Sequence, residues 1–267
     1  MIFIIAVIIL YILSRTVLFK VTEYVVTGNQ RYSAAQILTA GNLSTGKSMY
    51  SINTEKAEDR IRETLIYVES ISVRRSLPDK MVVTVEEAEP FACLQYENSR
   101  YAVISRSGRY LETEQPNARE ELIQLYGLEP KDVALGKSLQ SEDEYKLTIL
   151  WELLDTIDEV CPGSISYINL TDRTDILMGY GERLDIEFGS SQDYEYKLKY
   201  IKAVIDELDV DKPGRLIYHS KQAGISFVTD DDLAIMEEEI RRRAEQQQVN
   251  QDTAGQPSGE PDNKPGG

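Results

Sequence analysis

The chain has 267 residues, of which 45 are acidic and 29 are Lys or Arg, giving a formal net charge of −16. This charge argues against nucleic-acid binding, which requires clustered Lys and Arg to contact phosphates. Two cysteines and one histidine are too few for a structural zinc site at any usual spacing. Cys93 and Cys161 permit either one disulfide or two free thiols. We therefore expect no metal or other cofactor.

The first 19 residues form an apolar run. Nineteen helical residues span about 28 Å, close to the thickness of the hydrocarbon core of a bilayer. Arg15 interrupts the run near its end, where a long side chain can reach the interface. A cleaved signal peptide would need a positive start and small residues at a cleavage site, and neither is evident. The pattern predicts a retained single-pass transmembrane helix at residues 1–19, and we expect a short basic leader upstream of Met1.

Residues 20–90 have the pattern of a small α+β unit. Val21 to Thr27 reads as a strand, Ala34 to Ala40 as a short helix, and a second helix opens at Thr54. Two alternating runs then flank Leu77-Pro78-Asp79-Lys80, which predicts a β-hairpin within Val68 to Pro90. The order is β-α-α-β-β, with both helices on one face of the sheet.

Residues 91–229 are expected to form a mixed β-sheet domain with packed helices. The predicted strands are 91–96, 101–105, 109–111, 165–170, 176–180, 183–188, 215–220 and 224–228, and the predicted helices are 143–160 and 194–208. A charged helix is expected at 230–248. The Pro- and Gly-containing polar segment 249–267 predicts a disordered tail.

One motif suggests nucleotide chemistry. Gly41 to Ser48 (GNLSTGKS) fits the phosphate-loop pattern. A phosphate loop must connect a buried strand to the start of a helix, so that helix N-terminal amides face the phosphates. Here the preceding residues have a helical pattern, and the next helix starts near Thr54. We therefore interpret the segment as a loop between two helices and keep a membrane-tethered nucleotide-binding protein as a remote alternative.

The candidate acid–base residues also favour a structural interpretation. His219 has no nucleophile near it in the sequence, so a surface histidine on a strand is expected. Glu86 and Glu87 are adjacent on a strand and must point to opposite faces, so they cannot converge on one substrate atom. The sequence predicts that the chain is not an enzyme.

Several segments resemble the FtsQ/DivIB family of bacterial cell-division proteins. The likeness lies in Val25 to Asn29, Gly46 to Ile52, the hairpin Val73 to Lys80 and the segment Val82 to Pro90, which follow an apolar anchor. These segments look like a POTRA domain. The sequence departs from the family at Ala88-Glu89, where members often have an arginine before the proline. The resemblance implies one transmembrane helix (1–19), a POTRA domain (20–90), a β domain (91–229) and a variable tail.

The resemblance implies assembly at the division septum, with the N-terminus inside and the folded domains outside the cytoplasmic membrane. The implied partners are bitopic coiled-coil division proteins of the FtsB/DivIC and FtsL type, and a contact with the peptidoglycan synthase complex stays open. In the family the partner adds a strand to an exposed sheet edge. The matching positions are Tyr218 and Ser220 on the expected edge strand and Ile225 and Phe227 on the strand beside it. Ile225 and Phe227 are as well suited to filling the core. A POTRA-type chaperone module for envelope or secreted polypeptides is the other alternative.

Overall fold

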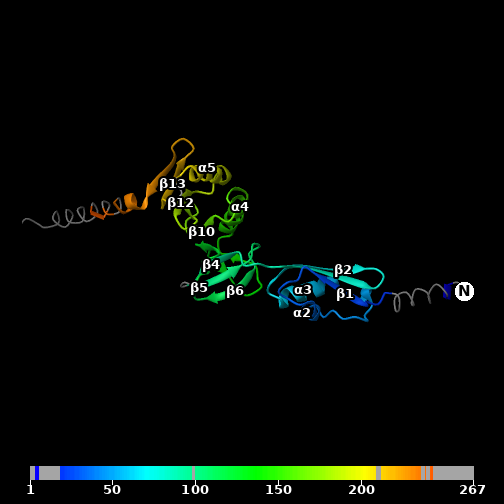
Figure 1. Ribbon diagram of the computed structural model, residues 1–267. Coiled ribbons are helices and arrows are strands. Elements are labelled where there is room, and N and C mark those ends of the chain that lie inside the picture. Colours follow the sequence, from blue (N-terminus) through cyan, green and yellow to red (C-terminus); the bar gives the residue numbers. More distant parts are fainter. Residues whose placement is uncertain are drawn as a thin grey trace, which may run out of the picture.

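The computed structural model describes residues 4–5, 19–97, 100–208, 212–235, 238 and 241–242. These residues form a small three-stranded unit followed end to end by a larger nine-stranded one (Figure 1). In this part of the chain no helix is long and apolar enough to cross a membrane. The predicted helix at residues 1–19 lies almost entirely outside the described residues, as do the predicted tail at 249–267 and much of the charged helix 230–248.

The small unit has the predicted β-α-α-β-β order. Its elements are β1 (Glu23–Thr27), α2 (Ala34–Ala40), the 3-10 turn η2 (Met49–Ser51), α3 (Thr54–Thr64), β2 (Val68–Ser76) and β3 (Lys80–Glu87). The sheet order is β1-β3-β2, in which β1 runs parallel to β3 and the hairpin strands are antiparallel. Ser33 forms a capping box with Gln36 at the start of α2, and Asn53 caps α3.

Both helices of the small unit cover the same face of its sheet. Met81, Val83 and Val85 alternate along β3, so their side chains share one face. They form one buried cluster with Ile37 of α2 and Ile61 of α3. The period-2 pattern of the hairpin therefore identified the core face of this unit.

The larger unit is a mixed sheet with two helices. Its strands are β4 (Ala92–Tyr96), β5 (Arg100–Ile104), β6 (Tyr110–Gln115), β7 (Ile123–Tyr126), β10 (Ile165–Asn169), β11 (Ile176–Tyr180), β12 (Leu184–Gly189), β13 (Gly214–Ser220) and β14 (Gly224–Thr229). The helices are α4 (Glu144–Val160) and α5 (Tyr194–Glu207), and a separate two-stranded ribbon pairs β8 (Pro130–Lys131) with β9 (Gln140–Ser141). The sheet order is β14-β13-β12-β11-β10-β7-β4-β5-β6.

The core of this unit lies between the sheet and its two helices. Leu150 and Leu154 of α4 and Ile201 of α5 are buried against Ile168 and Ile186 of the sheet. Trp151 and Leu147, predicted on the same stripe of α4, are partly buried against this cluster. The stripe was thus predicted correctly, whereas β7, which joins the two halves of the sheet by parallel pairing with β4 and β10, was missed.

The two units meet in a compact junction. Ala88, Val103 and Leu111 form a small buried cluster to which Ile66 and Tyr67 of the small unit contribute. The hydroxyl of Tyr67 donates to Glu112 at 3.0 Å. The junction places an apolar contact and a polar contact side by side, so the two units are packed against each other and not merely tethered.

Candidate functional site

The larger sheet ends at β14, which has β13 as its one strand neighbour among the described residues. An edge strand presents unpaired N–H and C=O groups that can pair with another chain. Figure 1 shows the β13–β14 hairpin at the end of the sheet next to α5. This hairpin contains all four residues that were predicted to bind the partner, Tyr218, Ser220, Ile225 and Phe227.

Two other sheet edges, at β6 and β2, carry contacts from outside the strand. At β6, the Tyr110 N–H donates to the carbonyl of Lys137 at 2.9 Å, and Gly136 donates back to Tyr110 at 2.8 Å. At β2, the N–H of Val73 is bound by the carboxylate of Glu58 of α3 at 2.7 Å. Such contacts blunt an edge against a further strand. Among the described residues, the outer edge of β14 carries no such contact over residues 224–228 and is open to a further strand.

The structure corrects the assignment of the edge strand. The sequence placed Tyr218 and Ser220 on the edge, but both belong to β13, whereas Ile225 and Phe227 belong to the edge strand β14. The cause is topological: β13 pairs in parallel with β12 after the α5 crossover, so its hairpin partner must take the outer position.

Tyr218, Ile225 and Phe227 share the face of the hairpin that is turned towards α5. Tyr218 lies opposite Ile225, and Phe227 lies opposite Leu216, which is fully buried. Ile225 and Phe227 are partly buried against the main core. The ring of Phe227 lies over Gly214, where an added Cβ would come within 2.8 Å of it. These side chains therefore lie at the margin of the hydrophobic core and also beside the open edge of the sheet.

Tyr218 rests on a buried lysine that the sequence did not single out. Lys197 of α5 is 6 % exposed, and its ammonium lies 5.0 Å from the centre of the Tyr218 ring. The same ammonium donates to the carbonyls of Ser190 at 2.7 Å and Phe188 at 3.3 Å. Burial lowers the pKa of Lys197, and the nearby Asp193 carboxylate opposes this effect. The amine thus fixes the β12–α5 connection beneath Tyr218.

Ser220 and His219 have local roles in the hairpin. The Ser220 hydroxyl oxygen accepts the N–H of Ala223 at 2.9 Å, which closes the turn between β13 and β14. His219 is exposed and its Nε2 lies 2.9 Å from the Ser226 hydroxyl on the neighbouring strand. Ser220 therefore shapes the hairpin, and His219 is the surface strand histidine that was expected.

The segment Gly41 to Ser48 does not have the geometry of a phosphate loop. It follows α2 instead of a strand, and α3 begins only at Thr54. The N–H of Gly46 donates to the carbonyl of Val21 at 2.7 Å, and the carbonyl of Lys47 accepts the N–H of Val21 at 2.9 Å. Since the loop pairs with the chain that leads into β1, it forms an interhelix loop and not an anion cradle.

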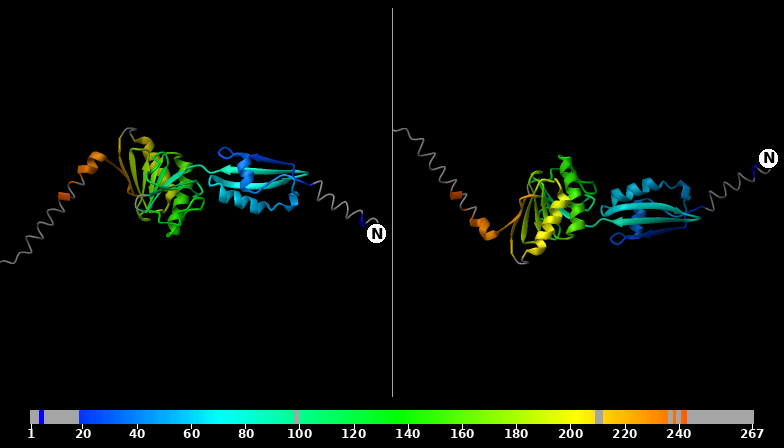
Figure 2. Two further views of the ribbon diagram at one scale, coloured as in Figure 1. Left: turned by 90° about the horizontal axis from the view of Figure 1, so that it is seen from below. Right: turned by 90° about the horizontal axis from the view of Figure 1, so that it is seen from above.

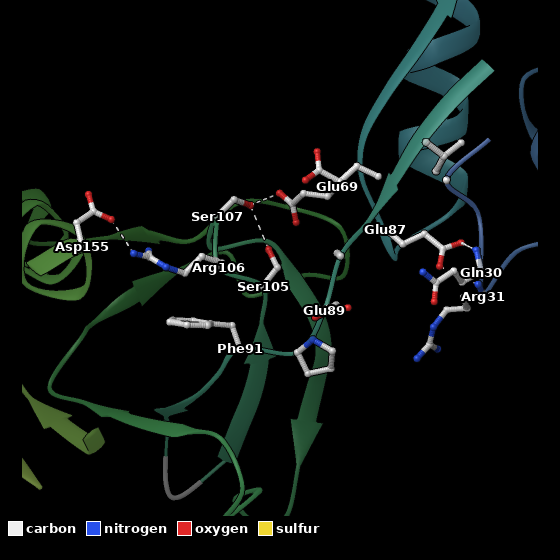
Figure 3. A pocket seen from close by; sticks show the side chains of 15 residues that line it. Gln30, Arg31, Glu69, Glu87, Glu89, Phe91, Ser105, Arg106, Ser107 and Asp155 are labelled. Carbon is white, nitrogen blue, oxygen red and sulfur yellow. Dashed lines mark hydrogen bonds and ion pairs between the residues drawn. The ribbon is translucent and has the colours of Figure 1, made fainter. Parts of the chain in front are cut away.

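A cleft of about 1110 Å³ lies between the two units and is lined by several carboxylates (Figure 3). Glu87 accepts the N–H groups of Arg31 at 2.7 Å, Gln30 at 3.0 Å and Tyr32 at 3.1 Å. Burial raises the pKa of Glu87, but these three donors outweigh it, and the net effect is a lowered pKa.

Two further carboxylates of the cleft, Glu86 and Asp155, each bind a different partner. Glu86 binds the hydroxyl of Ser70 at 2.9 Å, and Asp155 binds Arg106 at 2.6 Å. As predicted, Glu86 and Glu87 do not converge. Glu87 holds the 30–32 segment against β3.

Cys93 and Cys161 are free thiols, and both are buried. Burial raises the pKa of each thiol, which makes both less reactive. Among the described residues, no group of three His, Cys, Asp or Glu side chains is placed to hold a metal ion.

Two family models match this chain. The model for an FtsQ-type POTRA domain matches residues 19–88, and the model for the C-terminal region of the cell division protein FtsQ/DivIB matches residues 92–222. The second match ends at the hairpin turn, before β14.

Curated relatives agree with both matches. The cell division protein DivIB of Clostridium botulinum strain Hall is 25 % identical over 202 residues, covering 73 % of this chain and 77 % of the relative. DivIB of Bacillus subtilis strain 168 is 29 % identical over 103 residues, covering 38 % of each chain. The cell division protein FtsQ of Syntrophotalea carbinolica is 23 % identical over 195 residues, covering 71 % of this chain and 66 % of the relative. The chain therefore belongs to the FtsQ/DivIB family of cell-division proteins, which are scaffolds and not enzymes.

Proposed function

We propose that this protein is a membrane-anchored scaffold of the division septum. In this proposal residues 1–19 cross the cytoplasmic membrane once, with the N-terminus inside, and both folded units lie outside. A partner division protein adds a strand to the open edge of β14. The partners are bitopic coiled-coil proteins of the FtsB/DivIC and FtsL type.

The open edge of β14 is the observation that carries the proposal. The N–H and C=O groups on the outer side of β14 offer main-chain hydrogen bonds, and neighbouring side chains supply selectivity. Tyr218, Ile225 and Phe227 form a partly buried apolar surface along that edge. Aromatic side chains are frequent anchors of protein interfaces. An incoming strand therefore finds both backbone groups and an apolar surface in one place.

The chaperone alternative has less support in the structure. A chaperone module would be favoured by several tandem POTRA units, and the described residues contain one such unit. The FtsQ/DivIB match of the second unit instead favours a scaffold in division.

Partner binding tests the proposal. The full chain is placed in lipid nanodiscs and titrated with the extracellular region of the DivIC-type protein of the same organism. Biolayer interferometry measures the dissociation constant. We expect Tyr218→Ala to weaken binding about 30-fold, since loss of a central aromatic anchor typically costs about 2 kcal/mol. Tyr145→Ala is the control, since Tyr145 is an exposed tyrosine of α4.

Hydrogen exchange locates the binding site. Strand addition predicts that amides of residues 224–229 become protected from exchange when the partner binds. Circular dichroism serves as the control that each variant is folded. Unchanged affinity in Tyr218→Ala together with unprotected β14 amides would show that the partner binds elsewhere.

A further inference from the structure

The end of the small unit that adjoins the apolar segment carries a cluster of side chains that we call the N-terminal face. Its members are Phe19, Lys20, Lys47, Tyr50, Leu77 and Lys80. Three backbone hydrogen bonds hold their segments together, from Met49 to Phe19, from Val21 to Lys47 and from Thr22 to Asp79, each 2.9 Å long. Figures 1 and 2 show the tip of the β2–β3 hairpin at the same end of the unit as the start of the chain that leads into β1.

The apolar part of this face is exposed. Leu77, at the hairpin tip, is 62 % exposed, and Tyr50 is 45 % exposed. They are the two strongly exposed large hydrophobic side chains among the described residues of the small unit. Phe19 packs edge-on against Tyr50 with ring centres 5.4 Å apart. Exposed Leu and aromatic side chains gathered at one end of a domain mark a contact surface.

The charged part of the face is basic, although the whole chain carries a formal charge of −16. Lys20, Lys47 and Lys80 outnumber the two nearby carboxylates, which are Glu23, paired with Lys80 at 2.6 Å, and Asp79, which accepts the Thr22 hydroxyl at 2.8 Å. Lys20 and Lys47 are exposed. The face therefore presents positive charge beside aromatic and aliphatic side chains.

We propose that the N-terminal face docks on the surface of a lipid bilayer with anionic headgroups. The inference rests on the membrane anchor of the proposed function. Aromatic side chains favour the membrane–water interface, and Lys side chains there reach the headgroups. A basic residue near an anionic surface strengthens binding about five-fold. A solvated protein surface would need neither the exposed Leu77 nor the Phe19–Tyr50 pair beside the lysines.

Docking would orient the whole molecule. The N-terminal face and the β13–β14 hairpin lie at opposite ends of the described structure (Figures 1 and 2). The small unit would rest on the membrane, and the packed junction would hold the β14 edge away from it. A partner that is itself anchored in the membrane would then meet the edge at a fixed height.

Site-specific spin labels test the docking. The full chain, with Cys93→Ala and Cys161→Ala, is reconstituted in vesicles containing phosphatidylglycerol and carries a nitroxide at Leu77→Cys. The matched control is Leu135→Cys, at an exposed leucine of the larger unit. Oxygen concentrates in the bilayer and a nickel chelate concentrates in water, so their collision rates report immersion. We expect the label at 77 to favour oxygen and the label at 135 to favour nickel.

Two comparisons make the outcome decisive. Replacing Lys20 and Lys47 by Gln, or phosphatidylglycerol by phosphatidylcholine, is expected to lower the docked-to-undocked ratio about 25-fold, from two lysines at about five-fold each. Vesicle flotation reports anchoring independently. A chain that floats with vesicles while label 77 is as accessible to nickel as label 135 overturns docking alone. A chain that does not float overturns the membrane anchor and docking together.

Discussion

Arg109 is predicted to hold the two units together. Its side chain is 8 % exposed, its Nε donates to the carbonyl of Ile66 at 2.9 Å and its Nη2 donates to the carbonyl of Arg62 at 2.6 Å. Arg62 is in the last turn of α3, where carbonyls lack helical partners and the helix dipole favours a cation. A guanidinium of the larger unit thus caps a helix of the smaller one.

The expected cost of Arg109→Met follows from these two bonds. A hydrogen bond from a charged group contributes about 1.5–3 kcal/mol, so the pair contributes about 3–6 kcal/mol before the cost of burying the guanidinium. Methionine fills much of the volume but leaves two carbonyls without their donor. We expect the junction to lose about 3 kcal/mol, which is a large part of the stability of a typical domain.

Hydrogen exchange and urea unfolding measure this loss. Amides in the last turn of α3 should exchange about 100-fold faster in Arg109→Met, which corresponds to about 3 kcal/mol. Fluorescence of Trp151, the one tryptophan of the sequence, reports the larger unit separately. Arg100→Met is the matched control, because Arg100 is an exposed arginine 3.8 Å from Glu114 and such pairs contribute about 0–1 kcal/mol. Equal exchange in the two variants would refute the argument.

Two further predictions concern charged groups that bind backbone atoms of other segments. The pKa of Glu87 in the folded protein lies below its usual value of 4.5. The contribution of Glu87 to stability is therefore present in full above pH 4.5 and is lost as the pH falls through the folded pKa. Urea unfolding midpoints measured between pH 3 and 7 should show a step that Glu87→Gln removes, and an unchanged step would disprove the role of this carboxylate. The second prediction is that Lys197 acts on partner binding through Tyr218. Lys197→Met should then weaken binding about five-fold, as expected for a loss of about 1 kcal/mol of cation–π interaction, and should have no effect in a Tyr218→Ala background. Equal losses of affinity in both backgrounds would show a general structural role.

The sequence was sufficient to predict a helix or strand where one hydrophobic periodicity continued over most of the element. The helices α2, α4 and α5 were predicted to within one residue of the observed bounds, and the hairpin β2–β3 lies within the predicted range 68–90. In each case one face is buried and the opposite face is exposed, so burial imposes the pattern. Strand β7 was missed because it has four residues, and pairing with strands on both sides compensates for its weak local signal.

The charged groups that join segments were not predictable in this way. Arg109, Glu87 and Lys197 resemble surface residues in the sequence, and their roles depend on carbonyls or amides from distant parts of the chain. Arg109, for instance, binds carbonyls 43 and 47 residues away. Periodicity reports which face of an element is buried, but it contains no information about which backbone groups meet across a junction.

The edge strand, by contrast, was predictable from topology and was nevertheless assigned wrongly. The pattern β12–α5–β13 is a strand–helix–strand unit, so β13 pairs in parallel beside β12. The short turn after Ser220 then requires β14 to be antiparallel to β13, on the only side of β13 that β12 does not occupy. The outer position of β14 follows from these two steps. In the proposed function the partner residues are accordingly divided by role. β14 supplies the backbone edge, while Tyr218, one strand inside and next to Lys197, would act only through its side chain.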